Sequence, residues 1–209
     1  MLEKKKALRK IIKVRVSAIS ADERRKREEI LHNNLFSMPE FLSASNVMLF
    51  ANLPDEIDTF SLIDKCFAMG KKVYLPVING DDMTVAEFTG EYQIGRYGIK
   101  EPVIKQLGVR SEELGVNGLI TESRDNACIV RNSDTELVEV SFKKHFDFIL
   151  VPGVAFSPNG YRLGRGKGYY DKFLSKLPLY TVGVCFREQF FLDIPREPHD
   201  VPMQRVLVI

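Results

Sequence analysis

Residues 146–174 read FDFILVPGVAFSPNGYRLGRGKGYYDKFL. The first six are almost continuously apolar, which is typical of a strand covered on both faces of a parallel sheet. A polar, glycine-rich segment follows and leads into a helix that we expect to begin at about Tyr169. Open α/β sheets bind their ligands at the carboxyl ends of such strands. The stretch therefore predicts a central strand with a binding loop at its end.

The amino-terminal sequence predicts two helices. Apolar residues at three- and four-residue spacing indicate a helix over residues 2–18. Ser20 and Glu23 form a capping-box pattern that opens a second helix. That helix should end near Phe36, because Pro39 disfavours helical backbone at the residue before it.

A βαβ unit follows. Residues 46–50 (NVMLF) form a short apolar run, Thr59 can cap a helix that stops at Gly70, and residues 72–76 (KVYLP) read as the next strand. Residues 106–134 show no clear period, so we expect a loop or peripheral insertion there. Further strands are expected at residues 83–88, 137–142, 181–186 and 206–209. The pattern predicts one α/β domain over residues 1–209.

Composition excludes several classes of protein. The chain has 209 residues, 30 basic against 28 acidic ones, and a net charge of +2, which argues against a protein that binds nucleic acid through bulk charge. No run of about 18 apolar residues predicts a membrane span, and the basic first 19 residues do not resemble a secretory signal. Three widely spaced cysteines favour neither a disulfide framework nor a zinc ribbon. We therefore expect a reduced, cytoplasmic protein.

The loop in residues 162–168 is suited to a polyphosphate. Residues 164–168 (GRGKG) alternate glycines with cations, and Arg162 precedes them. Glycines let the backbone approach a ligand closely and let successive N–H groups face an anion, and a helix start adds unsatisfied N–H groups. Tyr169 and Tyr170 offer rings to a flat ligand, and Asp171 offers an oxygen ligand to Mg²⁺. The alternative is a flexible, solvated basic loop.

Two common nucleotide-binding motifs do not match this loop. A Walker A loop needs Ser or Thr after its lysine, but Gly168 follows Lys167, and Tyr161 stands where the first glycine of that motif would be. The spacing of the glycines also differs from the G-x-G-x-x-G pattern of dinucleotide-binding folds.

Residues 162–171 (RLGRGKGYYD) closely resemble the signature of the 5-formyltetrahydrofolate cyclo-ligases, also called methenyltetrahydrofolate synthetases. Shorter segments resemble the same family in the same order. They are residues 5–9 (KKALR) with Arg15, residues 54–59 (PDEIDT), residues 98–102 (GIKEP) and His199-Asp200.

This resemblance implies an enzyme that uses ATP and Mg²⁺ to convert 5-formyltetrahydrofolate to 5,10-methenyltetrahydrofolate, releasing ADP and phosphate. It also implies a three-layer α/β sandwich with a largely parallel or mixed twisted sheet, similar to the sugar-phosphate isomerase and CoA-transferase folds. Phosphoryl transfer depends mainly on positioning and charge neutralisation, which the basic loop can supply without a protein nucleophile.

The family pattern also implies roles for individual residues. The ATP-binding set is Lys5, Arg9, Arg162, Leu163, Gly164, Arg165, Gly166, Lys167, Gly168, Tyr169 and Tyr170. The folate-binding set is Ala51, Glu56, Arg165, Gly166, Lys167, Gly168 and Tyr169. Among these, Arg165, Lys167 and Tyr169 are expected to be catalytic, and Asp171 and Asp200 to hold Mg²⁺.

Each of these assignments has a structural alternative. The amino-terminal basic run could be a solvated helix face or a mitochondrial presequence, and Glu56 could be an exposed turn residue. Asp171 could stabilise the helix dipole without any metal, and Asp200 could be an ordinary loop residue. The three histidines (His32, His145 and His199) lack ligand spacing, so structural or surface roles are favoured for them.

The chain departs from the family pattern at two positions. Ser157 and Gln204 stand where many members carry Asp, so no acidic role is carried over to either.

Two other functions remain open: a sugar-phosphate isomerase or acyl-CoA transferase on the same fold, and an RNA-binding module that uses the basic helix and the Arg/Tyr loop. We expect small-molecule substrates, no nucleic-acid or membrane partner, and a monomer, because no long apolar heptad pattern appears.

Overall fold

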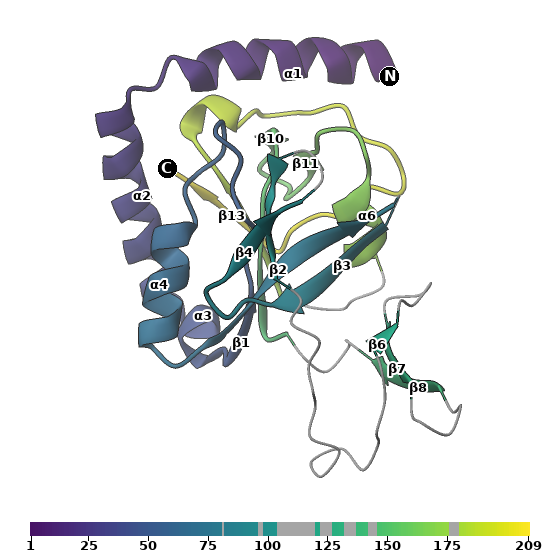
Figure 1. The fold of residues 1–209 in the computed structure, drawn as a ribbon. Helices are drawn as coiled ribbons and strands as arrows, with labels where there is room; N and C mark the ends of the chain where they lie inside the picture. The colour runs from purple at the N-terminus through teal and green to yellow at the C-terminus, as the bar shows by residue number, and fades with distance from the viewer. Residues whose placement is uncertain are drawn as a thin grey trace.

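The computed structural model is an α/β fold around a six-stranded sheet (Figure 1). It describes residues 1–80, 82–95, 98–103, 120–121, 127–131, 137–141, 146–175 and 180–209. The strands of the main sheet, in spatial order, are β13 (Arg205–Val208), β12 (Thr181–Cys185), β9 (Phe148–Val151), β1 (Asn46–Met48), β2 (Lys72–Asn79) and β3 (Asp82–Glu87). Neighbouring strands are parallel from β13 to β2, and β3 is antiparallel to β2. The mixed sheet flanked by helices agrees with the predicted fold class.

Helices cover both faces of this sheet. Helices α2, α3 and α4 lie on one side of it and α6 on the other, while α1 crosses one end (Figure 1). The helices are α1 (Leu2–Ser17), α2 (Ala21–Phe36), α3 (Pro39–Ser43), α4 (Phe60–Ala68) and α6 (Tyr169–Leu174), with a 3₁₀ turn, η3, at Arg187–Gln189. Among the described residues no helix is long and apolar enough to cross a membrane.

The core follows from the two-residue period of the strands. In β9, Phe148 and Leu150 face the layer formed by α1 to α4, and Ile149 and Val151 face the layer that contains α6. All four side chains are fully buried. This two-sided burial explains why the sequence of β9 is continuously apolar, as we expected for a central strand.

Smaller sheets complete the described part of the chain. β4 (Tyr92–Ile94) pairs with β5 (Lys100–Pro102), β10 (Ala155–Phe156) with β11 (Arg162–Leu163), and β6 (Ile120–Thr121), β7 (Ala127–Arg131) and β8 (Leu137–Ser141) form a three-stranded antiparallel sheet. β6 and β7 lie within residues 106–134, for which we expected a loop or insertion, so these described parts are strands. The rest of that interval, and Phe142 and His145, lie outside the described residues.

Two local predictions need correction, and a predicted helix end is followed by an unexpected short helix. Ser20 accepts a hydrogen bond from the Glu23 N–H, but the Glu23 carboxylate binds Arg27 at 2.7 Å, so the capping box is not reciprocal. Helix α2 ends at Phe36, as expected, and Pro39 then begins the short helix α3, which was not predicted, because proline is well suited to the first helical turn. Thr59 occupies the N-cap position of α4. Its buried hydroxyl donates to the Phe50 carbonyl and makes no capping bond.

Candidate active site

A cavity of about 1470 Å³ lies where several parallel strands end. Phe50 and Ala51 follow β1, and Pro152 and Gly153 follow β9; all four line the cavity. This is the edge at which open α/β sheets bind their ligands. Every residue for which the family pattern implies a role lines it: Lys5, Arg9, Ala51, Glu56, Arg162, Leu163, Gly164, Arg165, Gly166, Lys167, Gly168, Tyr169, Tyr170, Asp171 and Asp200.

Part of the cavity wall is apolar and was not predicted. Pro76 and Ile78 from β2, Met83 from β3, and Ile99 just before β5 line it. Ile99 belongs to the GIKEP segment, whose buried Glu101 accepts a hydrogen bond from the Ile78 N–H at 3.4 Å. The sequence could indicate only that these residues lie in or beside strands. That they line the same cavity depends on the order of the strands in the sheet, which one sequence does not specify.

The glycine-rich loop closes against helix α1. The Arg9 side chain donates through Nε to the Gly164 carbonyl at 2.9 Å. Gly166 has φ +104°, and a Cβ built there would lie 3.4 Å from Arg9 Nη2. Only glycine adopts such a backbone conformation readily, so this position permits both the turn and the close approach of Arg9. Burial lowers the pKa of the Arg9 guanidinium, which stays charged because its usual pKa is far above neutrality.

Arg165 connects this loop to the segment after β1. Its guanidinium donates to Asp55 Oδ1 at 2.6 Å and to Glu56 Oε1 at 3.0 and 3.2 Å. Glu56 Oε2 accepts from the Leu53 N–H at 3.0 Å. Burial lowers the pKa of Arg165, but the two carboxylates outweigh that effect, so its pKa is raised. Both Glu56 oxygens are thus engaged within the chain.

Arg162 forms a buried ion pair with Asp171. The Nη2–Oδ1 distance is 2.9 Å, and the side chains are 3% and 14% exposed. The guanidinium also lies over the Tyr170 ring, 5.4 Å from its centroid. Burial lowers the pKa of Arg162, an effect that Asp171 opposes. Burial likewise raises the pKa of Tyr170, whose hydroxyl is buried without a hydrogen-bond partner in the described structure. These three residues therefore form a buried cluster that joins the start of the loop to helix α6.

Lys167 differs from these held residues, whereas Tyr169 is held. Lys167 is exposed, lines the cavity and forms no ion pair or hydrogen bond within the described part of the chain. Tyr169 donates through its hydroxyl to the Gly80 carbonyl at 3.3 Å, which ties α6 to the end of β2. Lys167 is therefore a cation that can bind an anionic group without first breaking a described contact.

Lys5 lies between two carboxylates of the carboxy-terminal segment. Its ammonium is 2.8 Å from Glu197 Oε2 and 3.3 Å from Asp200 Oδ2. Burial lowers the pKa of Lys5, but the pairs with Glu197 and Asp200 raise it by more. Glu197 was not predicted as a site residue, although it lies three positions before Asp200 and lines the same cavity.

Arg15, by contrast, lies outside the cavity lining, with its guanidinium over the Phe191 ring.

Two groups of residues offer oxygen ligands to a cation. Asp171 Oδ2 and Asp200 Oδ1 make no hydrogen bond among the described residues, while the other oxygen of each carboxylate is engaged. Glu197, His199 and Asp200 also bring potential ligand atoms within 4.8 Å of one another. The Lys5 ammonium already binds two members of that second group. Carboxylate oxygens that accept no hydrogen bond suit a hard cation such as Mg²⁺; His199 Nε2 lies 3.9 Å from Asp200 Oδ1.

The two departures from the family pattern have structural roles. Gln204 Oε1 accepts from the N–H and the hydroxyl of Thr181, at 2.7 and 2.5 Å. Ser157 is buried in the turn between β10 and β11, where its N–H donates to the Tyr161 carbonyl at 2.9 Å. An amide oxygen can accept both bonds that a carboxylate would accept at position 204. Neither residue lines the cavity.

Comparisons with known proteins agree on one family. The sequence pattern of the 5-formyltetrahydrofolate cyclo-ligase family matches residues 1–209. The chain is 28% identical to the 5-formyltetrahydrofolate cyclo-ligase of Mus musculus, over 97% of this chain and 92% of that protein. It is 25% identical to the enzyme of the same name from Escherichia coli K12, over 94% and 96%.

Solved structures give the same result. The structure of the Aquifex aeolicus 5,10-methenyltetrahydrofolate synthetase matches with a TM-score of 0.72 at 30% identity, covering 98% of this chain and 89% of that one. A Mycoplasma pneumoniae 5,10-methenyltetrahydrofolate synthetase matches with a TM-score of 0.63 at 19% identity, covering 97% and 96%, and supports the fold. With the family pattern matched along its whole length, the chain belongs to the 5-formyltetrahydrofolate cyclo-ligase family.

Proposed function

We propose that this ligase closes the ring of 5-formyltetrahydrofolate to give 5,10-methenyltetrahydrofolate, using ATP and Mg²⁺ and releasing ADP and phosphate. The observation that supports this most strongly is the single cavity in which the glycine-rich basic loop faces the carboxylate of Glu56. One part of the cavity suits a polyphosphate, and the other suits a flat ligand with several N–H donors.

The chemistry needs an activated formyl oxygen. A formamide oxygen is a poor leaving group, so transfer of the γ-phosphoryl group of ATP to that oxygen forms an imidate phosphate and ADP. Nitrogen-10 of the folate then attacks the formyl carbon and gives up its proton, and the C–O bond breaks with release of phosphate. The protein supplies orientation and positive charge for both steps. No side chain has to form a covalent bond to the substrate.

The residues divide the work as follows. Lys5, Arg9 and the loop from Arg162 to Tyr170 hold ATP, with Arg165, Lys167 and Tyr169 facing the formyl group and the γ-phosphate. Asp171 and Asp200 would hold Mg²⁺, which would supply charge neutralisation for the phosphates. Glu56 accepts hydrogen bonds from the pterin ring beside Ala51. Since Arg165 occupies Glu56 Oε1, substrate binding exchanges that ion pair for pterin contacts.

The proposal extends to the setting of the enzyme. We infer one domain over residues 1–209 that acts as a cytoplasmic monomer on small molecules. A sugar-phosphate isomerase or CoA transferase needs a catalytic carboxylate facing an open phosphate pocket. Here Asp55 and Glu56 are both paired with Arg165, and Asp171 is paired with Arg162. No observation on the described residues favours the RNA-binding alternative.

An optical assay tests the proposed activity. The protein is incubated with 5-formyltetrahydrofolate, ATP and Mg²⁺, and the near-ultraviolet absorbance of the methenyl product is followed. We expect a signal that requires all three components. Omission of ATP, and replacement of Mg²⁺ by EDTA, are the controls. Absence of an ATP-dependent signal, under conditions where an established cyclo-ligase is active, would refute the proposal.

A further inference from the structure

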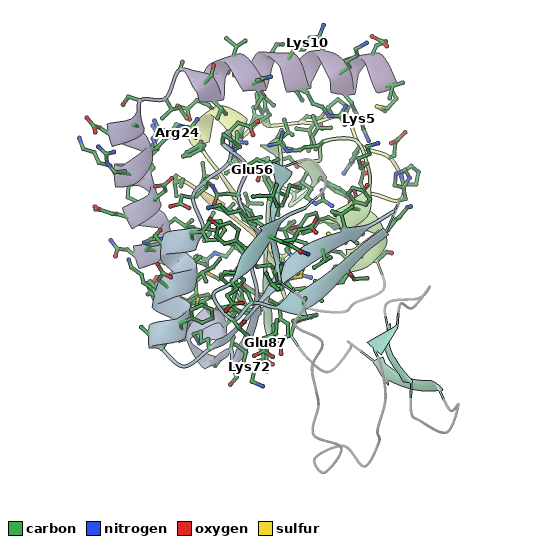
Figure 2. The ribbon with its side chains drawn as sticks, viewed as in Figure 1. Lys5, Lys10, Arg24, Glu56, Lys72 and Glu87 are labelled. Atoms are coloured by element: carbon green, nitrogen blue, oxygen red, sulfur yellow. The ribbon has the colours of Figure 1, made fainter. Side chains whose placement is uncertain are left out.

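Glu197 is the carboxylate that binds Lys5 most closely. Lys5 lies in the first turn of α1, on its inner side, whereas Lys10 lies on the outer side (Figure 2). The Lys5 side chain is only 10% exposed, and its ammonium is 2.8 Å from Glu197, against 3.3 Å from Asp200. The start of the chain is thus joined to a segment 192 residues later, at the wall of the cavity.

The backbone around Glu197 fixes the arrangement of the two carboxylates. The Glu197 N–H donates to Asp200 Oδ2 at 2.7 Å, and the Asp200 N–H donates to the Glu197 carbonyl at 3.0 Å. Asp200 Oδ2 therefore accepts from both Glu197 and Lys5, and the Asp200 side chain is only 8% exposed. Glu197 is more exposed, at 43%, and its Oε2 is directed to Lys5.

Under the proposed function, on which this inference rests, Mg²⁺ and Lys5 compete for the charge of Asp200. A divalent cation on that carboxylate repels the ammonium and weakens its longer contact. Glu197 then remains as the partner of Lys5. We propose that Glu197 is a positioning residue that keeps the Lys5 ammonium at the cavity wall, ready for the phosphates of ATP, when Mg²⁺ occupies Asp200.

A simpler view of Glu197 gives the opposite prediction. If this carboxylate acted only as a negative charge near the polyphosphate, its neutralisation would reduce repulsion and strengthen ATP binding. If it only stabilised the fold, its loss would lower the melting temperature and affect nucleotide binding equally with and without Mg²⁺. Positioning predicts weaker binding that depends on Mg²⁺.

The experiment measures ATP binding by isothermal titration calorimetry in the absence of folate. The wild-type protein, Glu197→Gln, Glu197→Asp and the control Glu188→Gln are each titrated once with Mg²⁺ and once with EDTA. Glu188 binds Arg27 at 2.7 Å and does not line the cavity, so its variant removes a similar ion pair elsewhere. Thermal unfolding by circular dichroism is recorded for each protein.

We expect Glu197→Gln to weaken binding of MgATP by about five- to tenfold, the size of a lost charged hydrogen bond that is partly exposed. In EDTA the loss should be less than about twofold, because Asp200 still holds Lys5. Glu197→Asp should recover part of the affinity, and Glu188→Gln should bind like the wild type.

Equal or tighter MgATP binding by Glu197→Gln would overturn the inference and leave the proposed function standing. An equal loss in Mg²⁺ and in EDTA would assign Glu197 a structural role and would also overturn it. If the wild-type protein bound no MgATP, the proposed function itself would fall, and this inference with it.

Discussion

Lys167 is the loop cation whose removal should affect chemistry with little effect on folding. Arg162 and Arg165 are paired with carboxylates, whereas Lys167 is exposed and has no partner within the described structure. We expect Lys167→Ala to lower kcat by about 10²- to 10³-fold through lost transition-state stabilisation. The free energy of unfolding should change by less than about 0.5 kcal/mol.

Steady-state kinetics and denaturant unfolding check this expectation for Lys167. The matched control is Lys26→Ala, which removes an exposed lysine of α2 that does not line the cavity. Wild-type kcat in Lys167→Ala would show that this lysine does not face the transferred phosphoryl group.

Glu56 should act on folate binding more than on turnover. Its side chain is 13% exposed, and its Oε1 is held by Arg165. We expect Glu56→Ala to raise the KM for 5-formyltetrahydrofolate by about tenfold or more, because buried pterin donors lose their acceptor. The KM for ATP should stay within about twofold. Glu40→Ala, at an exposed position of α3, is the control, and a change confined to the KM for ATP would contradict the assignment.

The sequence predicts which residues belong to the site better than it predicts which of them contact one another. Every residue to which the family pattern gave a binding or catalytic role lines one cavity, although Arg15 of the same pattern does not. The pairing of Arg165 with Asp55 joins residues 110 positions apart, and that of Lys5 with Glu197 joins residues 192 apart. Such contacts depend on the packing of α1 and of two loops, which has no local signal. For the same reason Glu197 was missed although its neighbours His199 and Asp200 were recognised.

At the level of elements, sequence patterns located the strands and helices better than their ends. The continuous apolar run of β9 and the helix beginning at Tyr169 lie where we expected them. Helix α2 ends at Phe36, as the following Pro39 predicted, but helix α3 was missed because proline also suits the first turn of a helix. Thr59 forms its bond to the Phe50 carbonyl because the start of α4 packs against the end of β1.

The interior strand β12, next to the edge strand β13, depends on a glycine for its packing. A Cβ at Gly183 would lie 2.3 Å from Phe156 Cε1, and the Phe156 ring is fully buried. We expect Gly183→Ala to destabilise the protein by about 1–3 kcal/mol, the usual range for overpacking a core. Urea unfolding measures this change. The double variant Gly183→Ala/Phe156→Leu should lose less than the sum of the single variants, since the smaller side chain leaves room for the methyl group. Simple additivity would show that the ring does not limit position 183.

Over the whole molecule, a small net charge conceals a strongly uneven distribution. The total is +2, but six basic side chains line the same cavity: Lys5, Arg9, Arg162, Arg165, Lys167 and Lys172. Three of them, Lys5, Arg9 and Arg165, contact carboxylates or a carbonyl of distant segments, while Arg162 pairs with the nearby Asp171. Without a ligand, these contacts hold α1, the glycine-rich loop and the carboxy-terminal segment together. The same cations are available to a polyphosphate, so folding and ligand binding use one set of charges.

The free energy of unfolding should decrease as the pH is lowered, because of His32, which does not line this cavity. His32 is 5% exposed between α2 and α4, its Nδ1 lies 2.8 Å from the Lys65 ammonium, and its Nε2 lies 3.5 Å from the Ser61 hydroxyl. Since the ammonium can only donate, Nδ1 is the acceptor of a neutral ring. Burial, followed by the charge of Lys65, lowers the pKa of His32 below 6.5, although Asp58 and Glu29 oppose this effect.

The sign of the pH effect follows from that lowered pKa. Between the folded pKa and 6.5, the unfolded chain binds a proton that the folded protein does not, so stability decreases as pH falls through this window. The slope due to one group is at most about 1.4 kcal/mol per pH unit. Guanidinium unfolding at several pH values between 5 and 8 should show a smaller slope for His32→Gln than for the wild type. His199→Gln, which replaces an exposed histidine, should keep the wild-type slope. An unchanged slope in His32→Gln would mean that His32 protonates equally well in the folded and unfolded states.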